Sequence, residues 1–187
     1  MTDTPASMTY GGYLALEELL TAQHPISDHH DEMLFIIIHQ TKELWLKQII
    51  HELHLARSTI RDDGLIQVHK SLSRVSRIQA VMTLSWDVLA TLTPTDYTSF
   101  RDVLGSSSGF QSAQFRQMEY MLGLKDGSHL KHQETGSIPH THPGAELNKP
   151  SLWDEANAAL ARVGFELPAE VLERDWSQPY RPSAAVE

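Results

Sequence analysis

Apolar residues recur three and four positions apart along most of this chain, which is the spacing of an amphipathic helix. The pattern is densest in DEMLFIIIHQTKELWLKQIIHELH, residues 31–54, and it predicts a long helix from about residue 31 to about residue 62. No segment shows the alternation of apolar and polar residues that marks a half-buried strand. The chain is therefore predicted to be all-α, and the length of this helix favours an antiparallel helical bundle.

Glycine, proline and capping residues mark the ends of the predicted helices. One helix should restart with Thr93 as its N-cap, Pro94 in its first turn and Asp96 completing a capping box, and it should end at Gly105. Residues 124–149 are rich in Gly, His and Pro and are predicted to form a loop. Other helices are expected over residues 10–23, 65–92, 110–123, 150–164 and 168–176. We expect a single helical domain spanning residues 1–187.

Composition narrows the possible chemistry. The chain has 187 residues, 41% of them apolar, with no apolar run long enough to span a membrane and no signal-peptide pattern, so we expect a cytoplasmic protein. Cysteine is absent, which excludes disulfides, thiolate metal sites and a cysteine nucleophile. The net charge of -9 argues against a nucleic-acid partner, because such proteins present a basic surface.

His39 stands in the middle of the apolar run of residues 31–54. Phe35, His39 and Glu43 are spaced by four and therefore share one face of the predicted helix. One interpretation is a core histidine bonded to a neighbouring group. The other is a neutral imidazole in an apolar pocket, where it would accept a hydrogen bond from a substrate N–H or move a proton. Helical spacing alone leaves both interpretations open.

A second set of candidate residues lies in DYTSFRDVLGSSSGFQ, residues 96–111. Tyr97 and Arg101 are one turn apart, and a guanidinium fork with a phenol beside it matches a carboxylate. The alternative is a surface arginine paired with Asp102 or another acid. The SSSG turn (106–109) either presents N–H groups and hydroxyls to an anion or joins a helix C-cap to an N-cap.

Metal-binding motifs are missing from the sequence. Neither Glu-x-x-His nor His-Glu-x-x-His occurs, which argues against a di-iron bundle or a zinc protease. Near the start, YGGYLALEELL is either an amphipathic helix with a flexible lead-in or a segment that crosses to a neighbouring subunit.

Several long blocks together are similar to the tryptophan 2,3-dioxygenase family. They are YGGYLALEELLTAQHPIS, HHDEMLFIIIHQTKELWLKQIIHEL, LTPTDYTSFRDVLGSSSGFQSAQFRQMEYMLG and PSLWDEANAALARVGFELP followed by RDW. The resemblance implies a helical bundle of the tryptophan/indoleamine dioxygenase type, a homotetramer and a haem b cofactor. It also implies that O2 is inserted across the indole C2–C3 bond of L-tryptophan to give N-formyl-L-kynurenine, in the kynurenine pathway.

The resemblance assigns roles to particular residues. His39 matches the distal histidine that contacts the indole N–H, and Phe35 matches the aromatic residue that packs on the indole. Arg101 matches the arginine that binds the substrate carboxylate, with Tyr97 beside it. The remaining matches are pocket-lining Ile36, Ile37 and Ile38, a haem-pocket serine at Ser108, and residues lent to a neighbouring subunit at Tyr10, Tyr13 and Leu14.

The chain departs from the family at its far end. The proximal haem ligand of the family is a histidine on a later helix, which is expected beyond Glu187, the last residue of this sequence. No histidine of the chain itself is therefore assigned as a metal ligand. Three explanations follow: a fragment of a normal dioxygenase, which we favour; a short relative without catalysis, acting as a helical scaffold; or altered haem binding. The missing helices should leave an apolar surface that drives association. A modified tryptophan as substrate is a further alternative.

Overall fold

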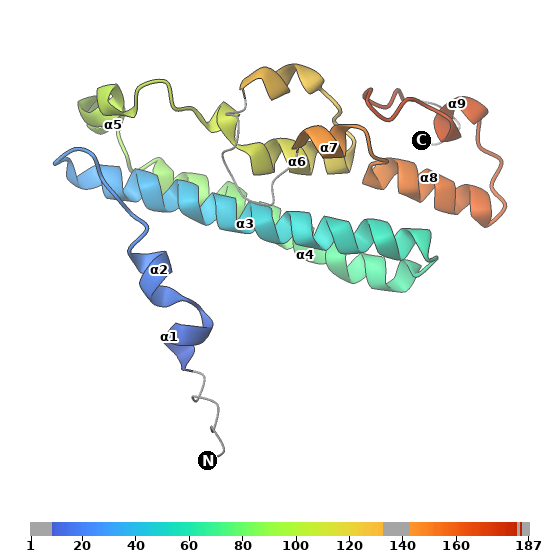
Figure 1. Cartoon of the computed structure of the whole chain (residues 1–187), viewed down its shortest axis with the longest axis horizontal. Coiled ribbons are helices and arrows are strands. Elements are labelled where there is room, and N and C mark those ends of the chain that lie inside the picture. Colours follow the sequence, from blue (N-terminus) through green and yellow to red (C-terminus); the bar gives the residue numbers. More distant parts are fainter. Residues whose placement is uncertain (1–8, 133–142, 183, 185–187) are drawn as a thin grey trace, which may run out of the picture.

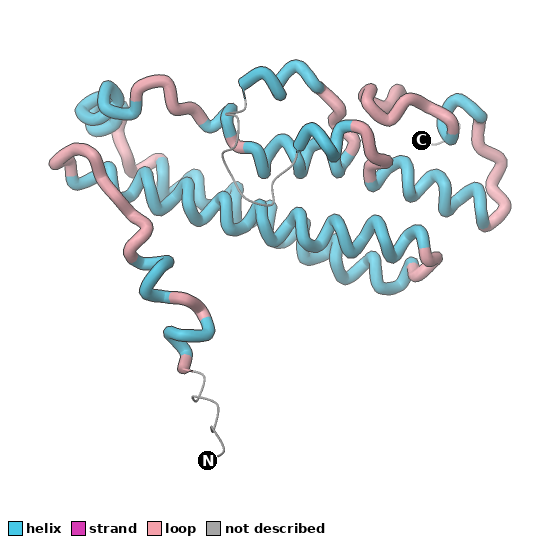
Figure 2. Tube along the Cα trace, in the orientation of Figure 1, coloured by secondary structure: helices cyan, strands magenta, loops and turns pink. Residues whose placement is uncertain are grey.

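The helical prediction is confirmed for residues 9–132, 143–182 and 184, which are the residues that a computed structural model of the chain describes (Figures 1 and 2). Every regular element among them is a helix. The α-helices are α1 Tyr10–Tyr13, α2 Leu16–Leu20, α3 His30–Arg61, α4 Leu65–Leu89, α5 Pro94–Arg101, α6 Ala113–Leu122, α7 Pro143–Leu147, α8 Leu152–Arg162 and α9 Ala169–Leu172. Short 3-10 turns are η1 Asp102–Leu104, η2 Gly109–Gln111 and η3 Gly127–His132.

Helices α3 and α4 form a long antiparallel pair that supports the rest of the chain (Figure 1). Apolar residues from the second half of α3 meet apolar residues of α4, and α6 lies across them. The fully or nearly buried members of this core are Leu46, Ile49, Leu53, Val75, Ile78, Met118 and Met121. Burial of such a shared face is what stabilises helices of this length, because helix propensity alone contributes little.

The predicted helix signals were accurate where they involve caps. The Thr93 hydroxyl accepts a hydrogen bond from the Asp96 N–H, and the Asp96 carboxylate accepts one from the Thr93 N–H, so the capping box is present. Gly123, with φ of +115°, ends α6 in the left-handed conformation that favours glycine. Helix α5, however, ends at Arg101, and η1 continues the chain to Gly105, which has φ of +56° and ψ of −128°.

The first predicted helix is broken in the structure. Instead of one helix over residues 10–23, the chain forms α1 and α2, separated at Ala15, whose φ is +49°. These two short helices pack on each other and stand away from the rest of the molecule (Figure 1). The segment that follows is tied to α3 by Gln40, which accepts a hydrogen bond from Gln23 and donates one to the carbonyl of Ala22. Residues 10–20 therefore form an arm, which we call the α1–α2 arm.

The predicted loop of residues 124–149 contains η3 and α7, while its part from 133 to 142 lies outside the described residues. The ammonium group of Lys125 is buried and holds the two ends of this segment together. It donates hydrogen bonds to the carbonyl oxygens of Glu146 at 2.6 Å, Leu147 at 3.1 Å and Lys149 at 2.7 Å. A helix end leaves carbonyls without intrahelical partners, so the lysine satisfies acceptors that would otherwise be orphaned.

Two ion pairs join the second half of α3 to α7 and α8, and the first of them is buried. Arg57 pairs with Glu146 at 2.8 Å, and both side chains are almost fully buried. The Arg61 guanidinium contacts Glu155 at 2.5 Å. Removing one partner of the Arg57–Glu146 pair leaves an uncompensated buried charge, so this contact fixes how α7 docks. The half-exposed Arg61 contributes less to the docking of α8. None of the described helices is both long and apolar enough to cross a lipid bilayer.

Candidate functional site

Aromatic side chains of α3 and α5 gather at the first half of α3. The Phe35 ring lies 4.2 Å from the His39 ring, 5.7 Å from the Tyr97 ring and 5.8 Å from the Phe100 ring, measured between centroids. Phe100 is fully buried and anchors α5 against α3. The structure thus brings together three residues that the sequence singled out on two separate helices.

His39 carries a hydrogen bond that defines its ring. Its Nδ1 atom lies 2.7 Å from the carbonyl oxygen of Phe35. Because a carbonyl oxygen can only accept, Nδ1 carries the proton, and in the neutral imidazole Nε2 is left as an acceptor. The two interpretations of His39 are therefore compatible: it bonds to its own helix through one nitrogen and keeps the other for a ligand.

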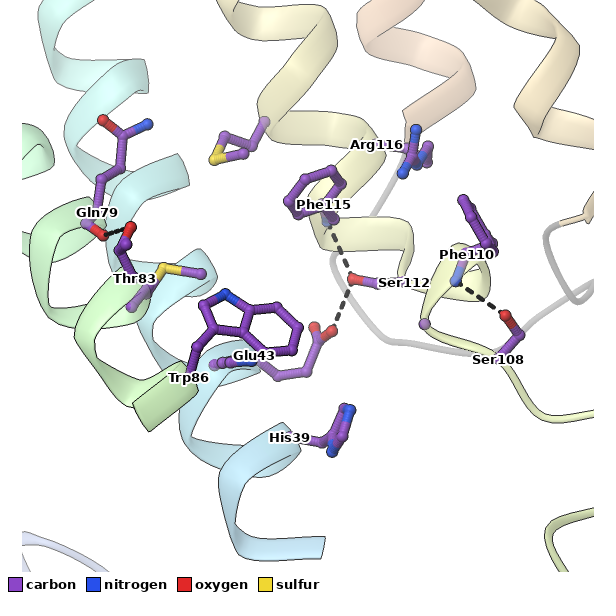
Figure 3. Close-up of a pocket in the computed structure, with 14 residues that line it drawn as sticks. His39, Glu43, Gln79, Thr83, Trp86, Ser108, Phe110, Ser112, Phe115 and Arg116 are labelled. Atoms are coloured by element: carbon purple, nitrogen blue, oxygen red, sulfur yellow. Dashed lines mark hydrogen bonds between the residues drawn. The ribbon is translucent and has the colours of Figure 1, made fainter. Parts of the chain in front are cut away.

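A cavity of about 690 Å³ opens beside His39, between α3, α4, α6 and the turn that carries η2 (Figure 3). Apolar and aromatic atoms provide most of the surface of its wall, and polar side chains are interspersed among them. It is lined by His39, Lys42, Glu43, Gln79, Met82, Thr83, Trp86, Ser108, Gly109, Phe110, Ser112, Phe115, Arg116 and Met118. Apolar clefts with a few placed polar groups are the usual form of small-molecule sites.

Glu43 fixes the position of the turn that closes one side of this cavity. The Ser112 hydroxyl donates a 2.6 Å hydrogen bond to the Glu43 carboxylate, and Gln114 donates one of 2.7 Å to its other oxygen. The same hydroxyl accepts from the backbone N–H of Phe115 and so caps α6 (Figure 3). One carboxylate of α3 thereby holds the start of α6 in place.

Ser108 lines the cavity and also caps η2. Its hydroxyl accepts a hydrogen bond from the Phe110 N–H at 3.3 Å, and its own N–H donates to the Gln111 side chain at 2.9 Å. Of the two interpretations of the SSSG turn, the structure shows the one in which a cap begins the next helical segment. The serine hydroxyl remains at the cavity wall (Figure 3).

Arg101 lies near the aromatic cluster but outside the cavity wall. Its Nη1 atom donates a 2.9 Å hydrogen bond to the carbonyl oxygen of Gly105. Neither Asp102 nor any other acid of the described residues forms an ion pair with it. Tyr97, one turn earlier, is half-buried against Phe35.

Of the residues that the resemblance assigned to the pocket, only His39 and Ser108 line this cavity; Phe35, Tyr97 and Arg101 lie outside its wall, and so do the remaining ones. Ile38 is buried in the helix pair, Ile36 is half-buried and Ile37 is 45% exposed. Three consecutive helical positions point about 100° apart, so they cannot face one pocket together. Tyr10 and Tyr13 lie on the α1–α2 arm and are 76% and 74% exposed, and Leu14 is exposed beside them.

Lys42, Trp86 and Arg116 are among the cavity residues that the sequence did not single out. The Lys42 Nζ atom lies 3.2 Å from the centre of the Trp86 ring, and buried Arg116 pairs with Glu119 at 2.6 Å. Lys42 follows His39 by three positions, so helical spacing already placed both on one face. For Trp86 and Arg116 the sequence held no comparable signal, because tertiary packing brings them to the site.

The side chains that line the cavity show whether it could hold a haem group. Its aromatic and apolar wall suits a flat apolar ring, and Lys42 and Arg116 offer positive charge to carboxylates. His39 is the one histidine in that wall, and the described residues contain no cluster of metal-ligating side chains. The residues therefore fit haem as walls and counter-charges, while they supply no proximal ligand.

The proximal histidine was expected beyond Glu187, and that expectation stays a prediction. Glu187 itself lies outside the described residues. Any histidine that follows Glu187 is likewise outside this sequence, which ends at that residue. The site that the structure describes is the cavity beside His39, the one histidine in its wall.

The fold and the cavity define an all-helical protein with an aromatic-walled pocket between its helices. The chain belongs to the tryptophan 2,3-dioxygenase family, whose family model matches residues 2–151. It is 58% identical over 180 residues to a tryptophan 2,3-dioxygenase of Caulobacter vibrioides, covering 96% of this chain and 68% of that protein. It is 52% identical to one of Bacillus cereus, covering 100% and 67%. A third, from Ralstonia pickettii, is 49% identical, with 99% and 66% covered. The chain thus spans about two thirds of the length of these relatives.

Proposed function

We propose that this chain forms the substrate-facing part of a haem-dependent dioxygenase that cleaves the indole C2–C3 bond of L-tryptophan with O2. The product would be N-formyl-L-kynurenine. Family membership supports the reaction class. The structural observation that supports the proposal most is the cavity, whose wall combines aromatic side chains with the free Nε2 of His39. Haem b, when bound, would supply the activation of O2, and the chain would supply position and electrostatics.

In this proposal, the aromatic cluster orients the indole. The Phe35 ring offers a face for stacking, and aromatic pairs of this kind gain from offset or edge contacts. His39, with its Nδ1–H donated to the Phe35 carbonyl, presents Nε2 to accept the indole N–H. The hydrogen bond fixes the ring plane and the direction of a polar ligand in an otherwise apolar site.

The amino-acid end of the substrate would bind to α5. Arg101 uses one donor on Gly105 and keeps the other N–H groups of its fork, which suit a carboxylate. Tyr97 would add a hydroxyl from the same helical face. Trp86, Phe110 and Met82 would pack against the faces and edges of the haem, and Ser108 would place a hydroxyl at its rim.

We further propose that the α1–α2 arm completes the pocket of a neighbouring subunit in a homotetramer. The arm packs on itself, and two of its tyrosines are largely exposed. Exposed apolar side chains also follow the outer face of α3 and α4, among them Leu44, Val81, Leu84 and Val88. Apolar surface of this extent favours association.

The proposal is tested by the absorption spectrum and the product of the purified chain. Haem added to the chain should give a Soret band that shifts on addition of L-tryptophan, and O2 should then yield N-formyl-L-kynurenine, identified by mass. No Soret band and no product would mean that this chain alone is either a fragment without the proximal half of the site or a relative without catalysis. A product from a modified tryptophan, with none from L-tryptophan, would assign a different substrate within the family.

A further inference from the structure

The ammonium group of Lys42 is buried in the cavity, and no described residue forms a hydrogen bond with it. Its Nζ atom lies 3.2 Å from the centre of the Trp86 ring and is shielded from water. No hydrogen-bond acceptor of the described residues reaches this atom, and no carboxylate among them pairs with it. The indole face therefore provides the one favourable contact that this cation makes.

An unpaired cation in such a place is unfavourable. Burial lowers the pKa of Lys42, because the surroundings do not replace the water that the charged form loses. A cation–π contact compensates for part of that loss, whereas a carboxylate would provide both charge and hydrogen-bond acceptors. The nearest acidic residue along α3, Glu43, is already engaged by Ser112 and Gln114.

A second cation in the cavity wall is also incompletely satisfied. Arg116 is 7% exposed and pairs with Glu119 through Nη1, but its Nε has no acceptor among the described residues. Lys42 and Arg116 come from different helices, α3 and α6, and both line the same cavity. A ligand with an apolar body and more than one carboxylate matches this wall better than a neutral ligand.

We propose that Lys42 is an anion-binding residue that receives a carboxylate of the aromatic ligand in this cavity. This proposal rests on the proposed function, which names two carboxylate-bearing ligands: a porphyrin and L-tryptophan. The porphyrin is the better match. Phe35 precedes Lys42 by seven residues, about 10 Å along α3, and the Tyr97–Arg101 pair assigned to the amino acid lies at the Phe35 end.

The decisive experiment compares metal-free protoporphyrin IX with its dimethyl ester. Metal-free porphyrin needs no iron ligand, so the measurement does not depend on a proximal histidine. Binding to the purified chain is followed by quenching of tryptophan fluorescence. Lys42→Met should weaken binding of the acid by about tenfold or more, as expected for loss of a charged hydrogen bond, and should leave binding of the ester unchanged.

The matched control is Lys47→Met, which removes the same charge from an exposed position on the same helix. It should change the affinity for neither porphyrin. Lys42→Arg, which keeps the charge, should retain most of the affinity for the acid. Thermal unfolding verifies the fold of each variant. Lys42→Met should unfold at no lower temperature than the parent chain, because it removes a buried charge that has no partner.

Equal losses for the acid and the ester would overturn the proposal, because the lysine would then act through packing. If Lys42→Met left the binding of both porphyrins unchanged, the proposal would require that it weaken the binding of L-tryptophan and not that of tryptamine. That result would show that Lys42 binds the carboxylate of the amino acid. No effect on any of these ligands, or no binding of any to the parent chain, would overturn it. Turnover is measured separately, so a chain that binds porphyrin through Lys42 yet forms no product would refute the proposed function alone.

Discussion

The guanidinium of Arg101 and the backbone carbonyl of Gly105 are joined by a 2.9 Å hydrogen bond across the end of α5. Gly105 has φ of +56° and ψ of −128°, a combination that residues with a Cβ atom avoid. The carbonyl is aimed back at α5 by this backbone conformation. The arginine proposed to bind the substrate carboxylate is thus held by a turn that requires glycine.

Substitution of Arg101 should discriminate between ligands with and without a carboxylate. Arg101→Ala should weaken binding of L-tryptophan by about 1.5–3 kcal/mol, the value of a charged hydrogen bond, and should leave tryptamine nearly unaffected. Titration calorimetry with both ligands measures this difference, and Asp102→Ala at the adjacent exposed position is the control. Equal losses for both ligands would remove Arg101 from carboxylate binding.

Substitution of Gly105 should act through Arg101. Gly105→Ala should lower the free energy of unfolding by about 1–3 kcal/mol, because alanine is strained in this conformation. It should also weaken the binding of L-tryptophan more than the binding of tryptamine, because the carbonyl that holds Arg101 would move. Gly144→Ala is the control, because Gly144 lies in α7 with open space around it. If Gly105→Ala affected both ligands alike, the turn would have no specific link to the carboxylate.

The effect of substituting His39 should depend on whether the substrate has an indole N–H. His39→Ala should slow turnover of L-tryptophan by about tenfold, the upper range for one neutral hydrogen bond, without abolishing it. With 1-methyl-L-tryptophan, which has no indole N–H, parent and variant should turn over at similar rates. A steady-state comparison of both substrates tests this. Complete loss of activity in the variant would instead indicate an essential proton transfer.

Removal of residues 1–14 should weaken substrate binding by the assembled protein more than it lowers the haem content. The exposed Tyr10 and Tyr13 contribute no wall to the cavity of their own chain. We therefore expect weaker L-tryptophan binding with an unchanged Soret absorbance per chain. Sedimentation of the parent chain should show an oligomer. A monomer with full L-tryptophan affinity after the deletion would contradict exchange of the arm.

Lys125 should give the chain a distinct pH dependence of stability. Burial lowers the pKa of Lys125 to about 8, although Asp154 and Glu146 act in the opposite direction. An unfolded chain keeps the ordinary value of 10.5, so between these values the unfolded state binds more protons than the folded state. The free energy of unfolding should therefore rise with pH across this interval, by up to about 3 kcal/mol, and this gain is lost again as the pH falls from 10.5 to about 8.

Urea unfolding of the parent chain and of Lys125→Met, at pH 8 and at pH 10.5, measures this effect. The variant loses the hydrogen bonds of Lys125 at either pH, so the informative quantity is the change with pH in the difference between the two chains. Lys70→Met, at an exposed position of α4, is the control. A difference that stays constant across the interval would show that Lys125 titrates normally in the folded chain.

Much of this fold could be predicted from local sequence signals. The long α3 helix and the capping box of Thr93 and Asp96 follow from spacing and from short-range hydrogen bonds. The break at Ala15 could not be predicted, because an alanine with positive φ carries no local signal. The same holds for Lys125, whose role appears only when three carbonyls from a distant segment surround it.

The site, too, could be predicted only in part from local sequence signals. Phe35 and His39 could be paired from helical spacing, and their rings do meet. Tyr97, which was singled out by its one-turn spacing to Arg101, packs on Phe35. The resemblance also suggested Ile36 and Ile37, which helix geometry turns away from the cavity. The partnership of Lys42 with Trp86 joins two helices and had no signal in either of them.

Helix α3 is a single rod of about 48 Å with two unlike halves. Most of its buried residues lie from Leu46 onward, in the half that is gripped by the core and by the ion pairs of Arg57 and Arg61. The half that carries Phe35 and His39 is held mainly by α5 and the end of α4. Anchorage and the cavity are thereby separated along one element: side chains near Phe35 and His39 can be changed without removing the contacts that hold its second half.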